Sequence, residues 1–526
     1  MDEALTSLRA SGYTEQEVVQ HFLQTSVARV TELQRYQHPD GTKSVIDTIQ
    51  SLAKEDPHFS PFYYILANFW FQSIGSSPAV ARLLPALLSL LAFPSAYWLC
   101  QELFLKTGVF AASLPVWIAV EMIAISPFQM LYARESRHYS LWTVTTLLST
   151  AALLRAVRRN TKTSWGIYAL TLAMVLYTCI LSVLMALTHG IYVIVIYGVR
   201  HIKILRAYLV ASLLGGLAFL PWIWIVITNF LQVKKVTNWT AIVSLRQSDL
   251  MNSWVQIFGR VFFDVNYKSW DFYVHRVLLV LIVYAFYYLC RKTPISVWLM
   301  IILLTVGSAL PLMLTDLVLG GIRSITARYF VPSLLGVQLA IAYLLGKKLT
   351  NFSSRPLQQQ LWRSLLVVLV SGSILSCVVN AQASVPWTKT FNGENIPIAK
   401  VVNQASRPLL VSETLTSSML SLSHLLKPSV IVFIQPRCQV CQNPPPSKFR
   451  DNLSALERMN SFSDVFLYDT LPSNKWLQYF AKQLNYKFEP AVFSFTEWEK
   501  DKPALWRFTP KSRQEQSSSE REWSKD

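Results

Sequence analysis

The chain has 526 residues, of which 52% are hydrophobic and 13% aromatic, and its mean hydropathy is +0.33. This composition is too apolar for an ordinary soluble domain of such length, so we predict an integral membrane protein. The formal net charge of +18 does not indicate nucleic-acid binding, because the lysines and arginines fall mostly in short loops between apolar runs, where membrane topology places them.

Residues 1–78 form a mostly polar segment, and its first part contains no apolar core of the kind found in a cleavable signal peptide. We predict that this segment is a first extracytoplasmic loop with juxtamembrane helices. A hydrophilic segment of about 75 residues is long to cross a membrane without a preceding helix. The sequence therefore also leads us to expect a first transmembrane helix upstream of Met1.

About ten apolar runs occupy residues 79–380, and most have the roughly 17 to 25 residues that a helix needs to cross a bilayer. Short polar loops separate these runs. We therefore predict a polytopic α-helical core of about ten transmembrane helices. The predicted spans cover about residues 79–103, 108–125, 139–156, 165–181, 183–199, 208–229, 277–290, 295–314, 330–346 and 361–379.

Basic residues in alternate loops predict the orientation of these helices. By the positive-inside rule, the side that carries most of the loop lysines and arginines is cytoplasmic. The opposite side then receives residues 1–78, the loop "LYARESRHYS", residues 232–276, the loop "DLVLGGIRSITARYF" and everything after residue 380. We predict a multi-pass protein of the plasma membrane. The residues assigned to the cytoplasmic side are Arg155, Arg158, Arg159, Lys162, Arg200, Lys203, Arg206, Arg291, Lys292, Lys347, Lys348 and Arg355.

Residues 381–510 mix strand-like runs such as "SVIVFIQ" and "DVFLYDTL" with helix-like runs, which predicts a small C-terminal α/β extracytoplasmic domain. Residues 511–526 are polar and charged, and we expect a disordered tail. Cys438 and Cys441 form a CxxC pair in this domain. No second pair follows to complete a zinc site, so we favour a local disulfide, with a redox-active pair as the alternative.

Ionisable side chains gather at the predicted extracytoplasmic ends of the helices, where such groups tend to be functional. They offer carboxylates that can take a proton and guanidinium groups that can hold a phosphate in bidentate fashion. The groups are Asp2 and Glu3; Lys54, Glu55, Asp56 and His58; Arg134, Glu135, Arg137, His138 and Tyr139; and Asp316, Arg323, Arg328 and Tyr329.

Three stretches carry a resemblance to a known family: "DEALTSLRASGYTE", "EDPHFSPFYYILANFWFQSIGSS" followed by "ARLLPALLSLL", and "YARESRHYSLW". In order and spacing they resemble membrane glycosyltransferases of the protein mannosyltransferase-like kind, which are family 39 and its bacterial relatives in the GT-C superfamily. The match is best over the first 200 or so residues and weaker through "ARYFVPSLLG". The C-terminal domain is similar to an extension in cyanobacterial members.

The resemblance implies an enzyme that transfers a hexose or pentose from a polyprenyl-phosphate carrier to an acceptor on the extracytoplasmic side, with inversion at the anomeric carbon. It implies that Asp2 is the general base for the acceptor hydroxyl and that Glu3 orients it. It assigns Arg134 to the lipid phosphate and Glu135 to a second catalytic carboxylate near the acceptor or a metal. The further substrate-binding candidates are Lys54, Asp56, His58, Tyr63, Tyr64, Arg137, Arg323 and Arg328.

The partners that follow are a polyprenyl-phosphate-linked sugar donor, a lipid, glycan or protein acceptor, and membrane lipids, with no nucleic acid. No cofactor is predicted with certainty, and a divalent metal ion stays an open alternative. Two other classes also stay open. One is a truncated, non-catalytic relative that acts as a binding or scaffold protein. The other is a transporter, which should carry its charges near mid-membrane and often shows repeated halves.

Overall fold

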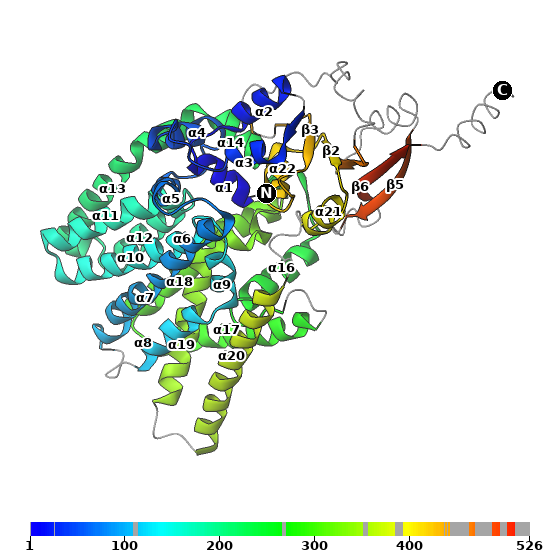
Figure 1. Ribbon diagram of the computed structural model, residues 1–526. Helices are drawn as coiled ribbons and strands as arrows, with labels where there is room; N and C mark the ends of the chain where they lie inside the picture. The colour runs from blue at the N-terminus through cyan, green and yellow to red at the C-terminus, as the bar shows by residue number, and fades with distance from the viewer. Residues whose placement is uncertain are drawn as a thin grey trace. The chain divides into compact units, whose positions relative to one another are not determined.

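The computed structural model describes residues 2–25, 27–108, 114–265, 270–350, 356–383, 393–435, 437–438, 440–441, 462–468, 486–494 and 502–510 (Figure 1). The chain divides into two compact units. The first, called here the sheet unit, contains residues 1–51, 71–78 and 385–526. The second, the helical unit, contains residues 52–70 and 79–384. The expected tail at 511–526 lies outside the described residues.

Each predicted apolar run of the helical unit is mostly helical where its residues are described, which confirms a polytopic α-helical membrane protein. Among the described residues, seven helices are long and apolar enough to cross a membrane. Two of them join shorter elements: 78–105 joins α6 (Pro78–Leu90), α7 (Ala92–Cys100) and the π-helix η1 (Gln101–Leu105), and 327–349 joins η4 (Ala327–Phe330) and α19 (Val331–Leu349). The other five are α10 (Tyr139–Arg159), α13 (Ile202–Thr228), α17 (Asp271–Lys292), α18 (Ile295–Leu319) and α20 (Pro356–Gln382).

The expected number of spans, about ten, is larger than the number of long helices. The pair α8 (Leu114–Ala124) and α9 (Pro127–Ala133) forms an eighth span if it is counted as one, and it bends by 52°. The bend falls where Ser126 precedes Pro127, because a residue before proline disfavours helical geometry. The remaining two runs are shorter helices, α11 (Lys162–Thr178) with 17 residues and α12 (Ser182–Ile196) with 15.

Shorter elements connect these helices. They are α14 (Phe230–Thr237), α15 (Trp239–Ile242) and α16 (Gln247–Gly259) in the long loop before α17, together with the 3-10 turns η2 (Val199–His201) and η3 (Arg323–Ile325). The helices α4 (Val45–Glu55) and α5 (Phe62–Ser73) precede α6.

Helices α10 and α19 form the centre of the helical unit. In their apolar windows 89% and 94% of residues are buried, against 22% in α13 and α20. Small residues permit this packing, since a Cβ added at Gly336 would clash with Thr305 and Ile301 of α18, and one at Gly346 with Pro115 of α8. Helix α20 lies beside α19 (Figure 1). Many of its apolar side chains are exposed. The outer helices thus offer the apolar surface that a bilayer requires.

A buried ion pair joins η1 to the end of α10. The Glu102 carboxylate accepts hydrogen bonds from Arg158 Nε at 2.9 Å and from Arg158 Nη2 at 2.7 and 2.9 Å. The Glu102 side chain is 5% exposed and that of Arg158 is 35% exposed. Arg158 belongs to the basic group that predicts the cytoplasmic side, so here a topological charge also holds two helices together.

We expect Glu102→Gln to lower the free energy of unfolding by about 1–2 kcal/mol. Breaking a fully buried pair costs about 3–5 kcal/mol, and the exposure of Arg158 reduces that cost. Thermal unfolding of the detergent-solubilised protein measures the change. Glu121→Gln, which removes an exposed carboxylate on α8, is the matched control. Equal shifts for the two variants would show that the pair does not stabilise the fold.

The sheet unit contains a six-stranded sheet in the order β1-β3-β2-β4-β6-β5. Its centre is parallel, with β2 (Pro408–Ser412) between β3 (Ile431–Ile434) and β4 (Asp464–Tyr468). On one side β6 (Pro503–Pro510) and β5 (Tyr486–Phe493) continue it as antiparallel strands (Figure 1). With α21 (Asn395–Val402) and α22 (Thr416–Ser423), these elements confirm a small C-terminal α/β fold.

The start of the chain contributes to this same fold. Strand β1 (Val27–Arg29) pairs antiparallel with β3 as the edge of the sheet. Helices α1 (Asp2–Ala10), α2 (Glu15–Gln24) and α3 (Val30–Arg35) place Leu8, Val18 and Leu33 in one hydrophobic core with Leu410 and Phe466. The first 36 residues and the C-terminal strands are therefore one folded unit, which the sequence pattern did not reveal.

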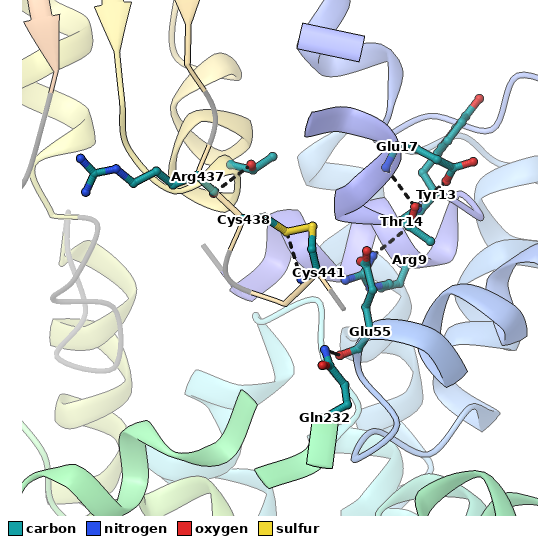
Figure 2. The surroundings of a disulfide bond; sticks show 10 residues. Arg9, Tyr13, Thr14, Glu17, Glu55, Gln232, Arg437, Cys438 and Cys441 are labelled. Carbon is teal, nitrogen blue, oxygen red and sulfur yellow. Dashed lines mark hydrogen bonds between the residues drawn. A yellow bond between two sulfur atoms is a disulfide. The ribbon is translucent and has the colours of Figure 1, made fainter. Parts of the chain in front are cut away.

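Polar contacts position these N-terminal helices. Helix α2 begins with a capping box, in which the Glu17 amide donates to Thr14 Oγ1 at 3.1 Å and the Thr14 amide donates to Glu17 Oε2 at 2.7 Å (Figure 2). The side-chain amides of Gln34 and Gln37 donate to the carbonyls of Ser423 and Leu420 at 2.8 and 3.1 Å. These bonds tie the segment after β1 to α22.

Candidate functional site

The turn between α4 and α5 presents the first part of the candidate site in the helical unit. Pro57 follows Asp56, where helical geometry ends, and the Phe59 amide donates to the Asp56 carbonyl at 2.9 Å. Ser60 Oγ donates to the Leu176 carbonyl of α11 at 2.9 Å. The turn is therefore held at both ends, and His58 and Phe59 lie on its middle.

The loop between α9 and α10 presents the second part. Within it the Arg137 amide donates to the Glu135 carbonyl at 2.6 Å. Glu135, Arg137 and His138 are all at least nine-tenths buried, with exposed fractions of 4%, 4% and 5%. Charged side chains are rarely buried to this degree unless other groups satisfy them. The loop thus directs ionisable groups into the protein rather than toward solvent.

The two parts meet at Arg137. Its Nη1 atom donates to the Tyr64 hydroxyl at 3.2 Å, and its guanidinium lies 4.8 Å from the centre of the Phe59 ring. The Phe59 ring in turn lies 5.9 Å from the His138 ring and 6.0 Å from the Tyr64 ring. We call His58, Phe59, Tyr64, Arg137, His138 and Arg328 the Arg137 cluster.

The charged groups of the cluster affect the pKa of His138, which precedes α10. Its pKa lies well below the usual value, first because the imidazole is buried and then because Arg137, Arg328 and His58 repel its protonated form. Arg328 comes from η4, almost 200 residues further along the chain. Groups from three separate segments therefore disfavour a proton on this buried imidazole, and His138 is neutral at pH 7.

We expect this histidine to make stability depend on pH below about 6.5, its unfolded pKa. As the pH falls below that value, the unfolded chain takes up a proton that the folded protein refuses, so the folded state loses up to about 1.4 kcal/mol per pH unit. Denaturant titrations in detergent between pH 7.5 and 5.5 measure this slope. His138→Asn should flatten it by that amount, whereas His201→Asn, which removes an exposed imidazole, should not.

The other aromatic and charged candidates of this region surround the cluster. Tyr63 is fully buried and packs edge-on against Tyr64 with ring centres 5.9 Å apart. Asp56 and Glu55 are buried, whereas Lys54 is exposed. The Glu55 carbonyl accepts a hydrogen bond from Gln232 Nε2 at 3.1 Å, which joins the long loop at α14 to this turn (Figure 2).

Arg134 and Arg323 donate hydrogen bonds outside the Arg137 cluster. Arg134 is exposed and donates to the carbonyls of Asn380 and Ala381 near the end of α20, at 3.1 and 3.5 Å. Arg323 Nη1 donates to Asp316 Oδ1 at 3.0 Å and to the Gly320 carbonyl at 2.8 Å, while the Ser324 amide donates to Asp316 Oδ2 at 2.5 Å. These contacts stabilise a helix end and the loop between α18 and α19.

Asp2 and Glu3 belong to the sheet unit. They form the first turn of α1, where acidic residues favour the helix because its amide dipoles leave the N-terminus positive. The Asp2 carbonyl accepts a hydrogen bond from Thr6 Oγ1 at 3.1 Å, and Ala4 and Leu8 anchor the helix in the hydrophobic core. The carboxylates thus start a helix that is packed along its length.

Sequence reasoning left Phe59 out of the candidate residues and gave His138 no role, although both lie in the Arg137 cluster. The signal for Phe59 was its position beside His58 in a turn bounded by two prolines. Among the described residues, no three His, Cys, Asp or Glu side chains are grouped so as to hold a metal ion. We therefore describe no step through a metal.

No family model matches the chain, and no curated protein matches it. The structure is similar to that of ArnT from Cupriavidus metallidurans bound to undecaprenyl phosphate, with 12% identity, a TM-score of 0.48 and coverage of 86% of this chain and 88% of that one. For ArnT from Cupriavidus metallidurans in the apo state, the identity is 11% and the TM-score 0.49, with coverage of 91% of this chain and 92% of that one. For the apo oligosaccharyltransferase of Archaeoglobus fulgidus, the identity is 12% and the TM-score 0.41, with coverage of 78% of this chain and 61% of that one.

ArnT and the oligosaccharyltransferase are membrane glycosyltransferases of the GT-C superfamily, whose motifs the sequence resembles. At TM-scores below 0.5, however, these likenesses carry no argument about what this chain does. We argue its function from its own residues.

Proposed function

We propose that this protein is an integral membrane glycosyltransferase. It moves a hexose or pentose from a polyprenyl-phosphate carrier to a lipid, glycan or protein acceptor, on the extracytoplasmic side and with inversion at the anomeric carbon. The motifs "DEALTSLRASGYTE" and "YARESRHYSLW", which resemble those of family 39 enzymes, support this proposal. So does the chemistry of the Arg137 cluster.

One observation carries the proposal: arginines from two separate segments act on one buried histidine at the start of a membrane-spanning helix. Arg137 and Arg328 both act on His138, directly before α10 begins. Keeping charged groups buried beside a membrane-spanning helix is costly, and such groups generally have a function. The phosphate of a lipid carrier has the complementary charge.

The reaction asks little of the protein beyond placement and charge. The acceptor oxygen forms a bond to the anomeric carbon while the bond from that carbon to the carrier phosphate oxygen breaks. The acceptor proton passes to the Asp2 carboxylate, which Glu3 orients, and Glu135 is the second proposed carboxylate. Arg137 stabilises the negative charge that develops on the departing phosphate, as preorganised donors do.

Other candidates take binding roles in this proposal. Lys54, Asp56, His58, Tyr63 and Tyr64 line the approach of the donor. We keep Arg134, Arg323 and Arg328 as candidates for the carrier phosphate. For Arg134 and Arg323 this role requires a guanidinium to serve a substrate in addition to the carbonyls and the carboxylate that it already binds.

The test is a transfer assay with the purified protein in liposomes. A donor with a radiolabelled sugar on polyprenyl phosphate is added together with a lipid extract from the native membranes as acceptor. We expect the label to move to an acceptor, with one equivalent of polyprenyl phosphate released for each sugar transferred. Movement of intact donor across the bilayer without release of carrier would instead show a transporter. An absence of both would favour a scaffold.

A further inference from the structure

A second reactive site lies in the sheet unit, at the disulfide between Cys438 and Cys441. We propose that this pair is redox-active and exchanges its disulfide with an external dithiol. Neither the glycosyl-transfer proposal nor the residues of the helical unit enter this inference. The pair is also separate from the four free cysteines, Cys100, Cys179, Cys290 and Cys377, which lie in apolar helices or directly after one.

The short spacing argues against a purely structural role. The two cysteines are three positions apart, so the bond closes a very small loop. A disulfide stabilises mainly by restricting the unfolded chain, and the gain grows with the length of the loop that it closes. A pair at this spacing therefore stabilises little, whereas the same spacing is typical of disulfides that form and break in catalysis.

The position in the sheet supports exchange. The pair follows β3 directly, at the carboxyl ends of the parallel strands β2, β3 and β4, the edge at which α/β proteins place functional groups. Two backbone hydrogen bonds hold Arg437, the residue before the pair. Its amide donates to the Thr414 carbonyl at 3.3 Å, and its carbonyl accepts from the Thr416 amide at 3.1 Å. The residue before Cys438 is therefore bonded to the first turn of α22.

The two sulfur atoms differ in access. Cys441 is fully buried, and its neighbour Val440 is 5% exposed, whereas Cys438 is only half-buried. An incoming thiolate can therefore attack only one sulfur of the bond, that of Cys438. This asymmetry sets a direction for the exchange, because the reaction rate depends on which sulfur is attacked and which one leaves.

A hydrogen bond prepares Cys438 for both steps. The Cys441 amide donates to Cys438 Sγ at 3.0 Å (Figure 2). A donor at this position favours a thiolate over a thiol on Cys438, as does the neighbouring start of α22. The Arg437 guanidinium points away from the disulfide and pairs with the Glu413 carboxylate at 2.9 Å (Figure 2). The environment of Cys438 is that of a nucleophile and leaving group.

The exchange takes place in two steps. One thiolate of the partner dithiol attacks Cys438 Sγ, the bond between Cys438 and Cys441 breaks, and Cys441 leaves and takes up a proton. The partner's second thiolate then attacks the partner sulfur of the mixed disulfide, and Cys438 leaves as a thiolate stabilised by the Cys441 amide. The protein gains two electrons and takes up one proton, on Cys441, while the two partner thiolates lose two electrons and close their own disulfide.

The experiment uses the full-length oxidised protein in detergent. It is incubated with a reduced peptide that carries two cysteines and, in a parallel arm, with glutathione, and thiols are then alkylated and quantified by mass spectrometry on the peptide that contains Cys438 and Cys441. We expect one peptide disulfide for each protein reduced. The serine variants are instead incubated with the same peptide in its disulfide form. We expect the remaining Cys438 thiolate of Cys441→Ser to attack that disulfide and form a mixed disulfide at least tenfold more than Cys441 of Cys438→Ser does.

Several outcomes would overturn the proposal. The disulfide could resist both thiols while the protein is folded, or the two serine variants could trap the peptide equally. Reduction could also lower the melting temperature by many degrees, which would show a structural bond. If a serine variant does not fold, the rate of reduction of the wild type by the peptide still decides the matter. Faster reduction by the peptide than by glutathione supports a dithiol as the partner, and the reverse would contradict it.

Discussion

Arg137→Ala is expected to lower sugar transfer at least 100-fold, mainly through kcat. Removing one preorganised donor from a developing oxyanion costs about 10²- to 10³-fold in other enzymes, and a guanidinium supplies two such donors to a phosphate. Arg137→Lys keeps the charge but loses the bidentate fork, so we expect about a tenfold loss. Initial rates at saturating and limiting donor concentrations separate kcat from KM.

A matched control lies on α10, the helix that follows the loop of Arg137. Arg155 also places its guanidinium over an aromatic ring, Trp98, at 5.9 Å, but it lies 16 residues beyond the start of α10, or about 24 Å along the helix. Arg155→Ala should leave transfer within about twofold of wild type. If both variants lose activity equally while remaining folded, Arg137 has no special part in the reaction.

Asp2→Asn should lower kcat by about 10²- to 10⁴-fold, the contribution of a positioned general base. The amide has almost the same shape as the carboxylate, so the first turn of α1 should persist and the protein should remain folded. Wild-type activity should fall at acidic pH as the base becomes protonated, and the residual activity of the variant should lack that fall. A pH–rate profile of both proteins measures the difference.

The control for Asp2 is another acid in the first turn of a helix of the same unit. Asp47 of α4 accepts hydrogen bonds from the Ser44 amide and hydroxyl, both at 2.8 Å, and we propose no catalytic role for it. Asp47→Asn should therefore affect stability but not kcat. If Asp2→Asn retains full transfer, another group removes the acceptor proton. If no variant alters any cellular role of the protein, a non-catalytic scaffold function is favoured over the glycosyltransferase.

Local features of the fold could be predicted because they depend on neighbouring residues. Runs of apolar side chains predict helices that cross a membrane, since an unpaired backbone is too costly in lipid. The prediction was right for the helical nature of each run and too high for the number of long spans, because α11 and α12 are shorter than a typical span. The CxxC spacing likewise pointed to a disulfide between Cys438 and Cys441.

The candidate site was only partly accessible to the same reasoning. The motifs singled out Arg137, His58 and Tyr64 as polar or aromatic residues near helix ends. They did not show that Phe59 lies against Arg137, or that Arg328 shares a buried point with His138. Nor did they show that Arg134 donates to carbonyls at the end of α20. Each of these contacts joins segments that are far apart in the chain.

The amino-acid sequence by itself determined the membrane class of this protein, the helical nature of its core and the residue types that could act on a phosphate. Those properties follow from composition and from spacing within about 20 residues. Only the tertiary structure decided that β1 completes a sheet with strands 400 residues later, and which arginines disfavour a proton on His138. Strand pairing and electrostatic potential depend on distance in space, which the order of residues along the chain does not specify.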